Sequence, residues 1–247
     1  MSEKTILVTG AARRLGSAIA REMHSTGANV LVHYHQAAAA AAATALVAEL
    51  NALRPFSAAC LQADLRQLET LPALVAGTIE RFGRLDALVN NASSFFPTPL
   101  GSIDLAAWDE LVGSNFKAPL FLTQAAAPHL LATRGAVVNI TDIHAERPLA
   151  GYPLYCAAKA GLLGLTRALA IELGPLVRVN AVAPGPILWP ESDDFDRAAR
   201  AEIVAHTLLQ RTGCPQDIAR AVHYLLADAT YVTGQVINVD GGRSAHL

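Results

Sequence analysis

The 247-residue sequence has only three cysteines, Cys60, Cys156 and Cys214, and they lie far apart. An odd number without a C-x-x-C pair argues against a disulfide framework, a cysteine metal site or a redox motif, and favours a reducing compartment. No run of lysine or arginine occurs and the net charge is −2, so the basic surface typical of nucleic-acid or anionic-membrane binding is not expected. We therefore expect partners to be small molecules or further copies of the chain, and we expect no metal.

Long apolar runs are also missing. No stretch of 18 or more apolar residues is free of charges or turn residues, so no membrane span is expected. The opening residues MSEKTILVTG enter a strand-like run at once and leave no room for the regions of a signal peptide, which predicts a cytoplasmic protein. With 52% apolar residues the chain has material for a large core, and its length suits one α/β domain spanning residues 1–247.

Short β-branched segments alternate with longer helical segments along the chain. The predicted strands lie at 5–9, 29–34, 57–63, 85–90, 135–141, 177–183 and 234–239, and the predicted helices near 14–26, 39–53, 67–82, 106–132, 154–174 and 215–228. This alternation predicts an α/β fold with a parallel sheet, and strands that are apolar at nearly every position are typical of a sheet covered on both faces. The segment 184–212, beginning PGPILWPESDD, breaks the rhythm, and we predict a substrate loop there.

A glycine-containing turn joins the first predicted strand to the first predicted helix. Gly10 suits a tight turn and Gly16 a close approach of the helix to the sheet, with backbone N–H groups at the helix start available to a phosphate. Arg13 and Arg14 lie at the positive end of that helix dipole, which is unfavourable unless an anion binds there. Surface-exposed arginines are the alternative, but a dinucleotide phosphate accounts for both side chains.

The second predicted strand ends in His33, Tyr34 and His35, followed by Gln36. The aspartate or glutamate that holds the ribose in an NAD-preferring site is missing there, which favours NADP(H). His35 and Arg13 could then hold the 2′-phosphate. The alternative is a pair of strand-end histidines without a ligand.

Polar residues also follow the next two predicted strands. Asp64 and Leu65 could contact an adenine, and Asn91, Ala92 and Ser93 could line the cofactor. An aspartate N-cap and a simple asparagine turn are the alternatives. Both segments lie at carboxyl ends of parallel strands, where open α/β sheets bind ligands.

Tyr155 and Lys159 are four residues apart in a long helical segment and therefore share a helix face. We expect the lysine ammonium to lower the pKa of the tyrosine from about 10 towards neutrality, so that the phenol can exchange a proton with a substrate. Thr141 and Asp142 end the preceding strand at the same sheet edge, and Asn115 could hold a water or a carbonyl against Lys159. An exposed pair on a helix is the alternative.

The ordered motifs TGxxxxxG, NNAS, a mid-helix asparagine, YxxxK and PG after the sixth strand resemble the short-chain dehydrogenase/reductase family over the whole chain. The resemblance implies a single-domain, Rossmann-type, doubly wound sandwich with a seven-stranded parallel sheet. It implies Tyr155 as general acid/base, Lys159 as the residue that positions the ribose and tunes the tyrosine, and Asn115 as support for a water relay. It also implies a homotetramer formed through the helices near 106–132 and 154–174, with the C-terminal VDGGRSAHL reaching a neighbouring site.

Three departures from the common family pattern resemble the pteridine reductase branch, whose members reduce dihydropterins or dihydrofolate. Arg14 stands where a middle glycine is usual, Asp142 where a serine is usual, and residues 91–100 replace an NNAG turn. By this resemblance Ser93 touches cofactor and substrate, and Phe95 stacks on a flat pterin. Arg14 would reach both pyrophosphate and substrate, and Asp142 would assist proton delivery through Tyr155. The expected role is thus in pterin or folate metabolism.

Two other functions stay open, a carbonyl or 3-oxoacyl reductase of the same family and a non-catalytic dinucleotide sensor. Pro186, Leu188 and Trp189 either close over the substrate or simply pack. The predicted cofactor contacts are Gly10, Arg13, Arg14, Leu15, Gly16, His33, Tyr34, His35, Asp64, Leu65, Asn91, Ala92, Ser93, Thr141, Tyr155, Lys159, Pro184, Gly185 and Ile187. The predicted substrate contacts are Arg14, Ser93, Phe95, Asp142, Tyr155, Pro186 and Leu188.

Overall fold

A single parallel sheet runs through the computed structural model, which describes residues 1–190 and 195–245. Its seven strands are β1 (Thr5–Val8), β2 (Asn29–Tyr34), β3 (Ala58–Gln62), β4 (Ala87–Asn90), β5 (Ala136–Ile140), β6 (Arg178–Pro184) and β7 (Val236–Val239). They are ordered β3-β2-β1-β4-β5-β6-β7, and every neighbouring pair is parallel. The predicted fold class and all seven predicted strands are confirmed.

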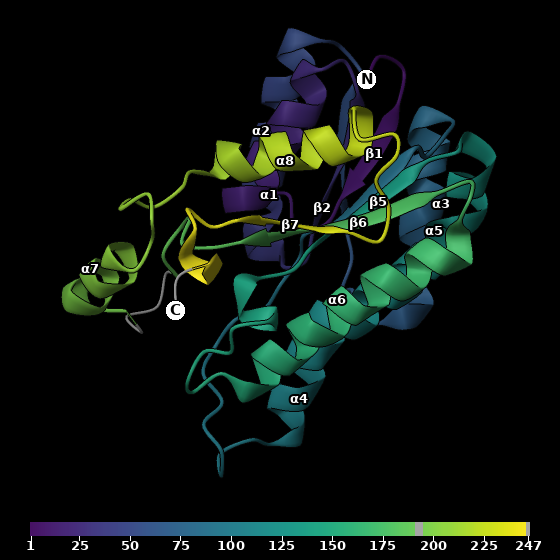
Figure 1. Cartoon of the computed structure of the whole chain (residues 1–247). Helices are drawn as coiled ribbons and strands as arrows, with labels where there is room; N and C mark the ends of the chain where they lie inside the picture. The colour runs from purple at the N-terminus through teal and green to yellow at the C-terminus, as the bar shows by residue number, and fades with distance from the viewer. Residues whose placement is uncertain (191–194, 246–247) are drawn as a thin grey trace.

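The sheet is covered by helices on both faces, as the apolar strands predict (Figure 1). One face carries α1 (Arg14–Ser25), α2 (Ala40–Leu53) and α8 (Pro215–Ala227), and the other carries α3 (Leu71–Phe82), α5 (Ala118–Thr133) and α6 (Pro153–Leu173). Each face has its own apolar core cluster, which includes Ile19, Leu46 and Val222 on the first face. Leu74, Leu122 and Leu173 belong to the cluster on the second face.

Strand β1 pairs with β2 on one side and with β4 on the other, so the strand order reverses at this point. In an open α/β sheet the crevice outside the carboxyl ends of such strands is the preferred ligand site. The topology therefore places the loops after β1 and β4 together, and both loops carry predicted site residues.

The predicted helix 106–132 is in fact two helices, α4 (Leu105–Val112) and α5, joined by a π-helical turn at Gly113–Lys117. A π turn accommodates one additional residue in the helix. Asn115 lies in this turn and is completely buried. Gly113, Ser114 and Asn115 are weak helix formers, so the residue pattern did mark the interruption, although one continuous helix was predicted.

The predicted loop 184–212 also contains a helix, α7 (Arg197–Ala205). Its first turn is stabilised by Asp196, whose carboxylate accepts the backbone N–H of Ala199 at 2.8 Å. Part of the predicted substrate loop is therefore helical. Residues 191–194 of the same loop lie outside the described residues.

Helix α6 is, by length and composition, apolar enough to cross a membrane, with a mean hydropathy of 1.3 and half of the window buried. No such segment was expected, because Lys159 and Arg167 interrupt the apolar run. In the fold α6 packs against β6 and α5 and carries Tyr155 and Lys159.

Candidate active site

Two adjoining cavities open at the carboxyl ends of the strands. The first, of about 460 Å³, is lined by the loops after β1 to β6, and the second, of about 660 Å³, lies beside it under α7 and the C-terminal turn. Both cavities are lined by the same seven residues where they meet: Arg13, Arg14, Ser93, Asp142, Tyr155, Gly185 and Leu188. A group bound in one cavity would thus face a group bound in the other beside Tyr155 and Asp142.

The first cavity contains every predicted cofactor contact except Tyr34, and the second contains all seven predicted substrate contacts. Tyr34 packs against the apolar core on the α1 face of the sheet. Successive strand residues point to opposite faces, so His33 and His35 can line the cavity only if Tyr34 points away. The prediction for Tyr34 was therefore wrong.

His33 is buried and supports the glycine-containing turn. Its Nδ1 accepts the backbone N–H of Gly10 at 3.1 Å, and its Nε2 lies 3.0 Å from the carbonyl of Ala63. Burial lowers the pKa of His33 to about 4, so the ring is neutral at pH 7. Neither ring nitrogen is left for a phosphate, and the predicted polar contact of His33 with a cofactor is replaced by a supporting role.

The turn that His33 supports fits a pyrophosphate. A Cβ on Gly10, whose φ is +61°, would lie 3.0 Å from the Cα of Ala92, and one on Gly16 only 2.3 Å from the carbonyl oxygen of Gly10. Helix α1 begins beside this turn, and its N-cap residue Arg13 provides no side-chain cap. Backbone N–H groups at a helix start and two close glycines are the elements that a dinucleotide phosphate needs.

Arg14 adopts a φ of +53°, in the left-handed region that glycine occupies most easily. This explains why glycine is usual there in the wider family. The Arg14 guanidinium donates to the carbonyl of Trp189 at 2.9 Å, which ties the start of α1 to the 184–212 segment. Arg14 lines both cavities, so its side chain lies where it could contact a cofactor in the first cavity and a substrate in the second, as predicted.

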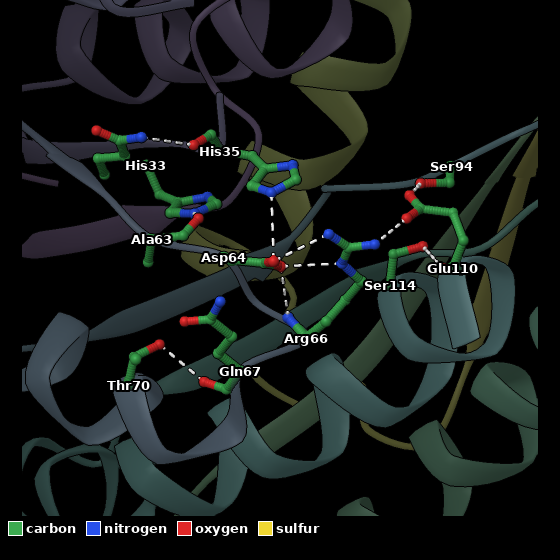
Figure 2. Close-up of polar contacts among 11 residues, drawn as sticks. His33, His35, Ala63, Asp64, Arg66, Gln67, Thr70, Ser94, Glu110 and Ser114 are labelled. Atoms are coloured by element: carbon green, nitrogen blue, oxygen red, sulfur yellow. Dashed lines mark hydrogen bonds and ion pairs between the residues drawn. The ribbon is translucent and has the colours of Figure 1, made fainter. Parts of the chain in front are cut away.

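At the other end of the first cavity lies a cluster of charged side chains (Figure 2). Arg66 donates to the carboxylate of Asp64 at 2.9 and 3.0 Å and also contacts Glu110. The hydrogen bonds from Arg66 lower the pKa of Asp64 to about 2. His35 lies 3.5 Å from the same carboxylate. Arg13 donates at 2.8 Å to the carbonyl of Ala38, which lies three residues after His35 in the sequence.

Tyr155, Asp142 and Lys159 come together where the two cavities meet. The Tyr155 hydroxyl donates to Asp142 Oδ2 at 2.7 Å, and the other carboxylate oxygen accepts the backbone N–H of His144 at 2.8 Å. The Lys159 ammonium donates to the carbonyl of Ile140 at 2.9 Å and lies 5.7 Å from the centre of the Tyr155 ring. The predicted grouping at this sheet edge is therefore present.

The expected lowering of the Tyr155 pKa is wrong for this structure. Burial of the phenol, the nearby charge of Asp142 and the hydrogen bond to it all raise the pKa of Tyr155 well above its usual value. Burial also lowers the pKa of Lys159 to about 8, which leaves the ammonium charged at pH 7. The sequence spacing showed that Lys159 lies near Tyr155. It did not show that the Tyr155 side chain is buried or that its hydroxyl points to Asp142.

Asn115 makes its side-chain hydrogen bonds to the segment after β4. Its amide donates to the carbonyls of Ser94 and Leu111 at 2.9 and 3.0 Å, and its Oδ1 accepts the Ser93 hydroxyl at 2.6 Å. The Asn115 side chain lines neither cavity and is directed to Ser93 and Ser94 instead of to Lys159. Its predicted place in a water relay stays a prediction.

Phe95 lies in an aromatic cluster with Tyr152 and Tyr155. Its ring stacks on Tyr152 with centroids 4.6 Å apart and meets Tyr155 edge-on at 4.8 Å. One face of Phe95 is therefore covered, and a planar substrate could stack only on the other. Phe95 lines the second cavity, as predicted.

Sequence reasoning missed several lining residues. Ser94, Glu110, Ser114 and Arg66 line the first cavity, and His144, Phe195, Ile203 and Arg243 line the second. These residues come from loops and helices distant in sequence, and no local motif marks them. Arg243 donates to the carbonyl of Ile203 at 2.8 Å and lines the second cavity of its own chain, and the predicted reach of the C-terminal segment to a neighbouring site stays a prediction. Residues 246–247 of that tail lie outside the described residues.

Known proteins resemble the chain over nearly its whole length. A family model described as enoyl-(acyl carrier protein) reductase matches residues 10–244. Pteridine reductase 1 of Leishmania tarentolae is 40% identical over 96% of the chain and 95% of its own length. The 3-oxoacyl-[acyl-carrier-protein] reductase FabG of Staphylococcus aureus is 35% identical over 97% of both chains.

Among solved structures, a blue fluorescent protein from a metagenomic library in complex with NADPH superimposes with a TM-score of 0.91, at 37% identity and covering 98% of both chains. Together with the parallel seven-stranded sheet and the Tyr155–Lys159 pair, these matches show that the chain belongs to the short-chain dehydrogenase/reductase family of oxidoreductases.

Proposed function

We propose that this enzyme is an NADP(H)-dependent reductase of a pterin, converting dihydrobiopterin, dihydromonapterin or dihydrofolate to the tetrahydro form. The hydrogen bond of 2.7 Å between Tyr155 and Asp142, at the junction of the two cavities, carries this proposal. It is supported by the 40% identity to a pteridine reductase. A pterin is a planar heterocycle with N–H donors, and Asp142 offers a carboxylate acceptor beside the free face of Phe95.

The first cavity would hold the cofactor, which supplies a hydride. Gly10 and the start of α1 would hold its pyrophosphate, and Lys159 has two ammonium hydrogens beyond its bond to Ile140 for the ribose hydroxyls. Arg13 would favour NADP(H) by its positive charge and His35 as a hydrogen-bond donor, next to Gln36, which brings no carboxylate. The complex of the related blue fluorescent protein with NADPH supports the same choice.

Reduction of a carbon–nitrogen double bond requires a proton on nitrogen as well as a hydride on carbon. Tyr155 is a neutral phenol at pH 7, as its raised pKa requires, and it therefore carries the proton that the ring nitrogen needs. Asp142 holds the phenol in place through one oxygen and is itself held by the backbone of His144 through the other. After the transfer, the nearby charge of Lys159 stabilises the phenolate.

A substrate panel tests the proposal. Purified enzyme with NADPH should oxidise the cofactor in the presence of dihydrobiopterin, dihydromonapterin or dihydrofolate, followed by the loss of absorbance of NADPH. Tyr155→Phe should bind NADPH as the wild type does and lose turnover by about a hundredfold or more. A lack of turnover with all three pterins would refute the pterin proposal.

A 3-oxoacyl reductase is the second candidate, supported by relatives at 35% identity that carry this name. Asp142 argues against it, because a carboxylate repels the negative charge that develops on a carbonyl oxygen, whereas a hydroxyl can donate to it. Turnover of an acetoacetyl thioester above that of every pterin would favour the second candidate. A dinucleotide sensor is the third candidate, and it would be supported only if Tyr155→Phe kept the biological function.

We further propose that the protein is a cytoplasmic homotetramer. Large apolar side chains are exposed on α4, α5 and α6, namely Leu105, Trp108, Leu131 and Ile171, and such side chains are typical of subunit interfaces. Light scattering should give the mass of four chains. A stable monomer would refute the assembly.

A further inference from the structure

The guanidinium of Arg66, which lines the first cavity, lies between the carboxylates of Asp64 and Glu110 (Figure 2). Arg66 follows β3 and donates through Nε and Nη2 to Asp64 on the same loop, in a two-pronged contact of 3.0 and 2.9 Å. Its Nη1 contacts Glu110 on α4, which is 44 residues away in sequence. Two carboxylates on different elements therefore fix the plane of one side chain.

Gly113, the first residue of the π-helical turn, leaves space for the Arg66 side chain. A Cβ on Gly113 would lie 3.3 Å from Cγ of Arg66, which is tighter than an ordinary side-chain contact. The aliphatic part of Arg66 thus lies against the backbone of the turn, where a larger residue would displace it. The arginine is held both by its charged end and by its stem.

Asp64 has little capacity left for a ligand. Its Oδ1 accepts both the backbone N–H and Nε of Arg66, and its Oδ2 accepts Nη2 and lies 3.5 Å from Nε2 of His35. A carboxylate offers about four acceptor positions. Sequence reasoning assigned the adenine contact to Asp64, but the carboxylate is almost saturated by its neighbours.

A chain of hydrogen bonds leads from Arg66 to the substrate side. Glu110 also accepts the Ser94 hydroxyl, and the Ser94 carbonyl accepts the Asn115 amide at 2.9 Å. Asn115 in turn accepts the hydroxyl of Ser93, the residue that lines both cavities. Glu110 therefore holds both Arg66 and the segment leading to Phe95 through its two carboxylate oxygens.

We propose that Arg66 is the adenine-binding residue of the cofactor site, and that Glu110 is a positioning residue which holds Arg66 and the Ser93–Phe95 segment together. This inference rests on the proposed use of NADP(H). A guanidinium is flat and weakly hydrated, and it binds well against an aromatic ring. Arg66 and Leu65 line the same end of the cavity, so one offers a cationic surface and the other an apolar surface to the base.

The ion pairs of Arg66 are too exposed to explain its position by fold stability alone. The side chains of Arg66 and Glu110 are 38% and 32% exposed, and pairs of this kind contribute little to folding. Arg21 provides a matched control, since it makes a similar two-pronged contact with Glu49 at 2.8 Å between α1 and α2. Neither Arg21 nor Glu49 lines the first or the second cavity.

The test measures binding of NADPH, of adenosine 2′,5′-bisphosphate and of reduced nicotinamide mononucleotide, which lacks adenine, to the intact enzyme. Arg66→Gln should weaken the two adenine-containing ligands by about fivefold and leave the mononucleotide unchanged. Glu110→Gln should weaken the same two ligands and also raise the pterin KM with little change in kcat. The double variant should bind the adenine-containing ligands with the affinity of Arg66→Gln, because each single change already removes the same interaction with adenine. Arg21→Gln should behave as the wild type, and all variants should keep their melting temperature within a few degrees.

Unchanged affinity of Arg66→Gln for adenosine 2′,5′-bisphosphate would overturn the inference, and so would an equal loss for the mononucleotide. Failure of the wild type to bind any adenine nucleotide would overturn both the inference and the proposed cofactor. Adenine-selective loss in Arg66→Gln without turnover of any pterin would support the inference and refute only the proposed substrate.

Discussion

Tyr155 donates its hydroxyl hydrogen to Asp142, 2.7 Å away, at a position where the wider family has serine. A serine there could donate to a substrate oxygen, whereas the carboxylate can only accept. The same carboxylate raises the pKa of the tyrosine, together with burial, and keeps the phenol protonated. The pair is thus suited to giving a proton to a basic ring nitrogen.

Replacing Asp142 should separate proton delivery from cofactor binding. In Asp142→Asn the amide can accept only through one oxygen, so it cannot satisfy both the Tyr155 hydroxyl and the His144 N–H. We expect kcat for the pterin to fall about a hundredfold and the NADPH affinity to stay within twofold. Steady-state kinetics and fluorescence titration measure the two effects. A variant with wild-type kcat would show that Asp142 is dispensable.

Cofactor affinity should depend on pH through Lys159. Its pKa is lowered to about 8, so the ammonium proposed to hold the ribose loses its charge above that pH. We expect NADPH binding to be constant between pH 6 and 7.5 and to weaken as the pH rises beyond 8, because neutral lysine has fewer donors. Titrations over pH 6–10 test this. The raised pKa of Tyr155 places its own ionisation at higher pH, so affinity that is constant up to pH 10 would contradict the assignment to Lys159.

Stability should fall in mild acid because of His33. The unfolded chain takes up a proton on this histidine near pH 6.5, but the folded protein does so only near pH 4. Stability from this group is therefore complete above about pH 6.5 and decreases by about 3 kcal/mol as the pH falls to 4.

The variant His33→Asn keeps an acceptor for the Gly10 N–H and removes the titrating ring. Urea unfolding at several pH values should show a smaller acid loss in this variant. His24, whose pKa burial also lowers, is present in both proteins and cancels in the comparison. Equal acid losses would exclude His33 as the source.

Arg14→Gly should stabilise the fold and impair the enzyme. Arg14 has a φ of +53°, and glycine adopts such a conformation without the strain of about 1 kcal/mol that a larger residue bears. The variant also removes the hydrogen bond to Trp189 and a positive charge shared by the two cavities. We expect a rise in unfolding free energy of about 0.5 to 1 kcal/mol together with a higher KM for cofactor and substrate. A less stable variant would mean that the contacts of Arg14 outweigh its backbone strain.

Much of the fold could be predicted because parallel strands and their helices leave strong local patterns. All seven strands were found from apolar runs, and the Tyr155–Lys159 pair was found from its helical spacing. The π turn between α4 and α5 was missed although Gly113, Ser114 and Asn115 are weak helix formers, because the helical composition on both sides of it suggested one continuous helix. Helix α7 lies within the predicted substrate loop, after the prolines and acidic residues with which that segment begins.

The details of the site depended on contacts between distant segments. The direction of the Tyr155 pKa follows from burial and from the orientation of Asp142, and neither can be read from spacing. The contact of Arg66 with Glu110 joins residues 44 positions apart, and Arg243 reaches Ile203 from the last turn of the described chain. Tyr34 was misplaced for a simpler reason, since alternation along β2 was not applied to three consecutive candidates.

The π turn between α4 and α5 inserts one additional residue into an otherwise regular helical segment. Each residue of an α-helix is rotated by about 100° from the last, so an inserted residue changes which side chains face inward beyond it. Deleting one residue at Ser114 would restore regular winding and turn the Asn115 position away from Ser93 and Ser94. A single codon thus separates a plain packing helix from one that anchors the segment after β4 beside the cofactor cavity.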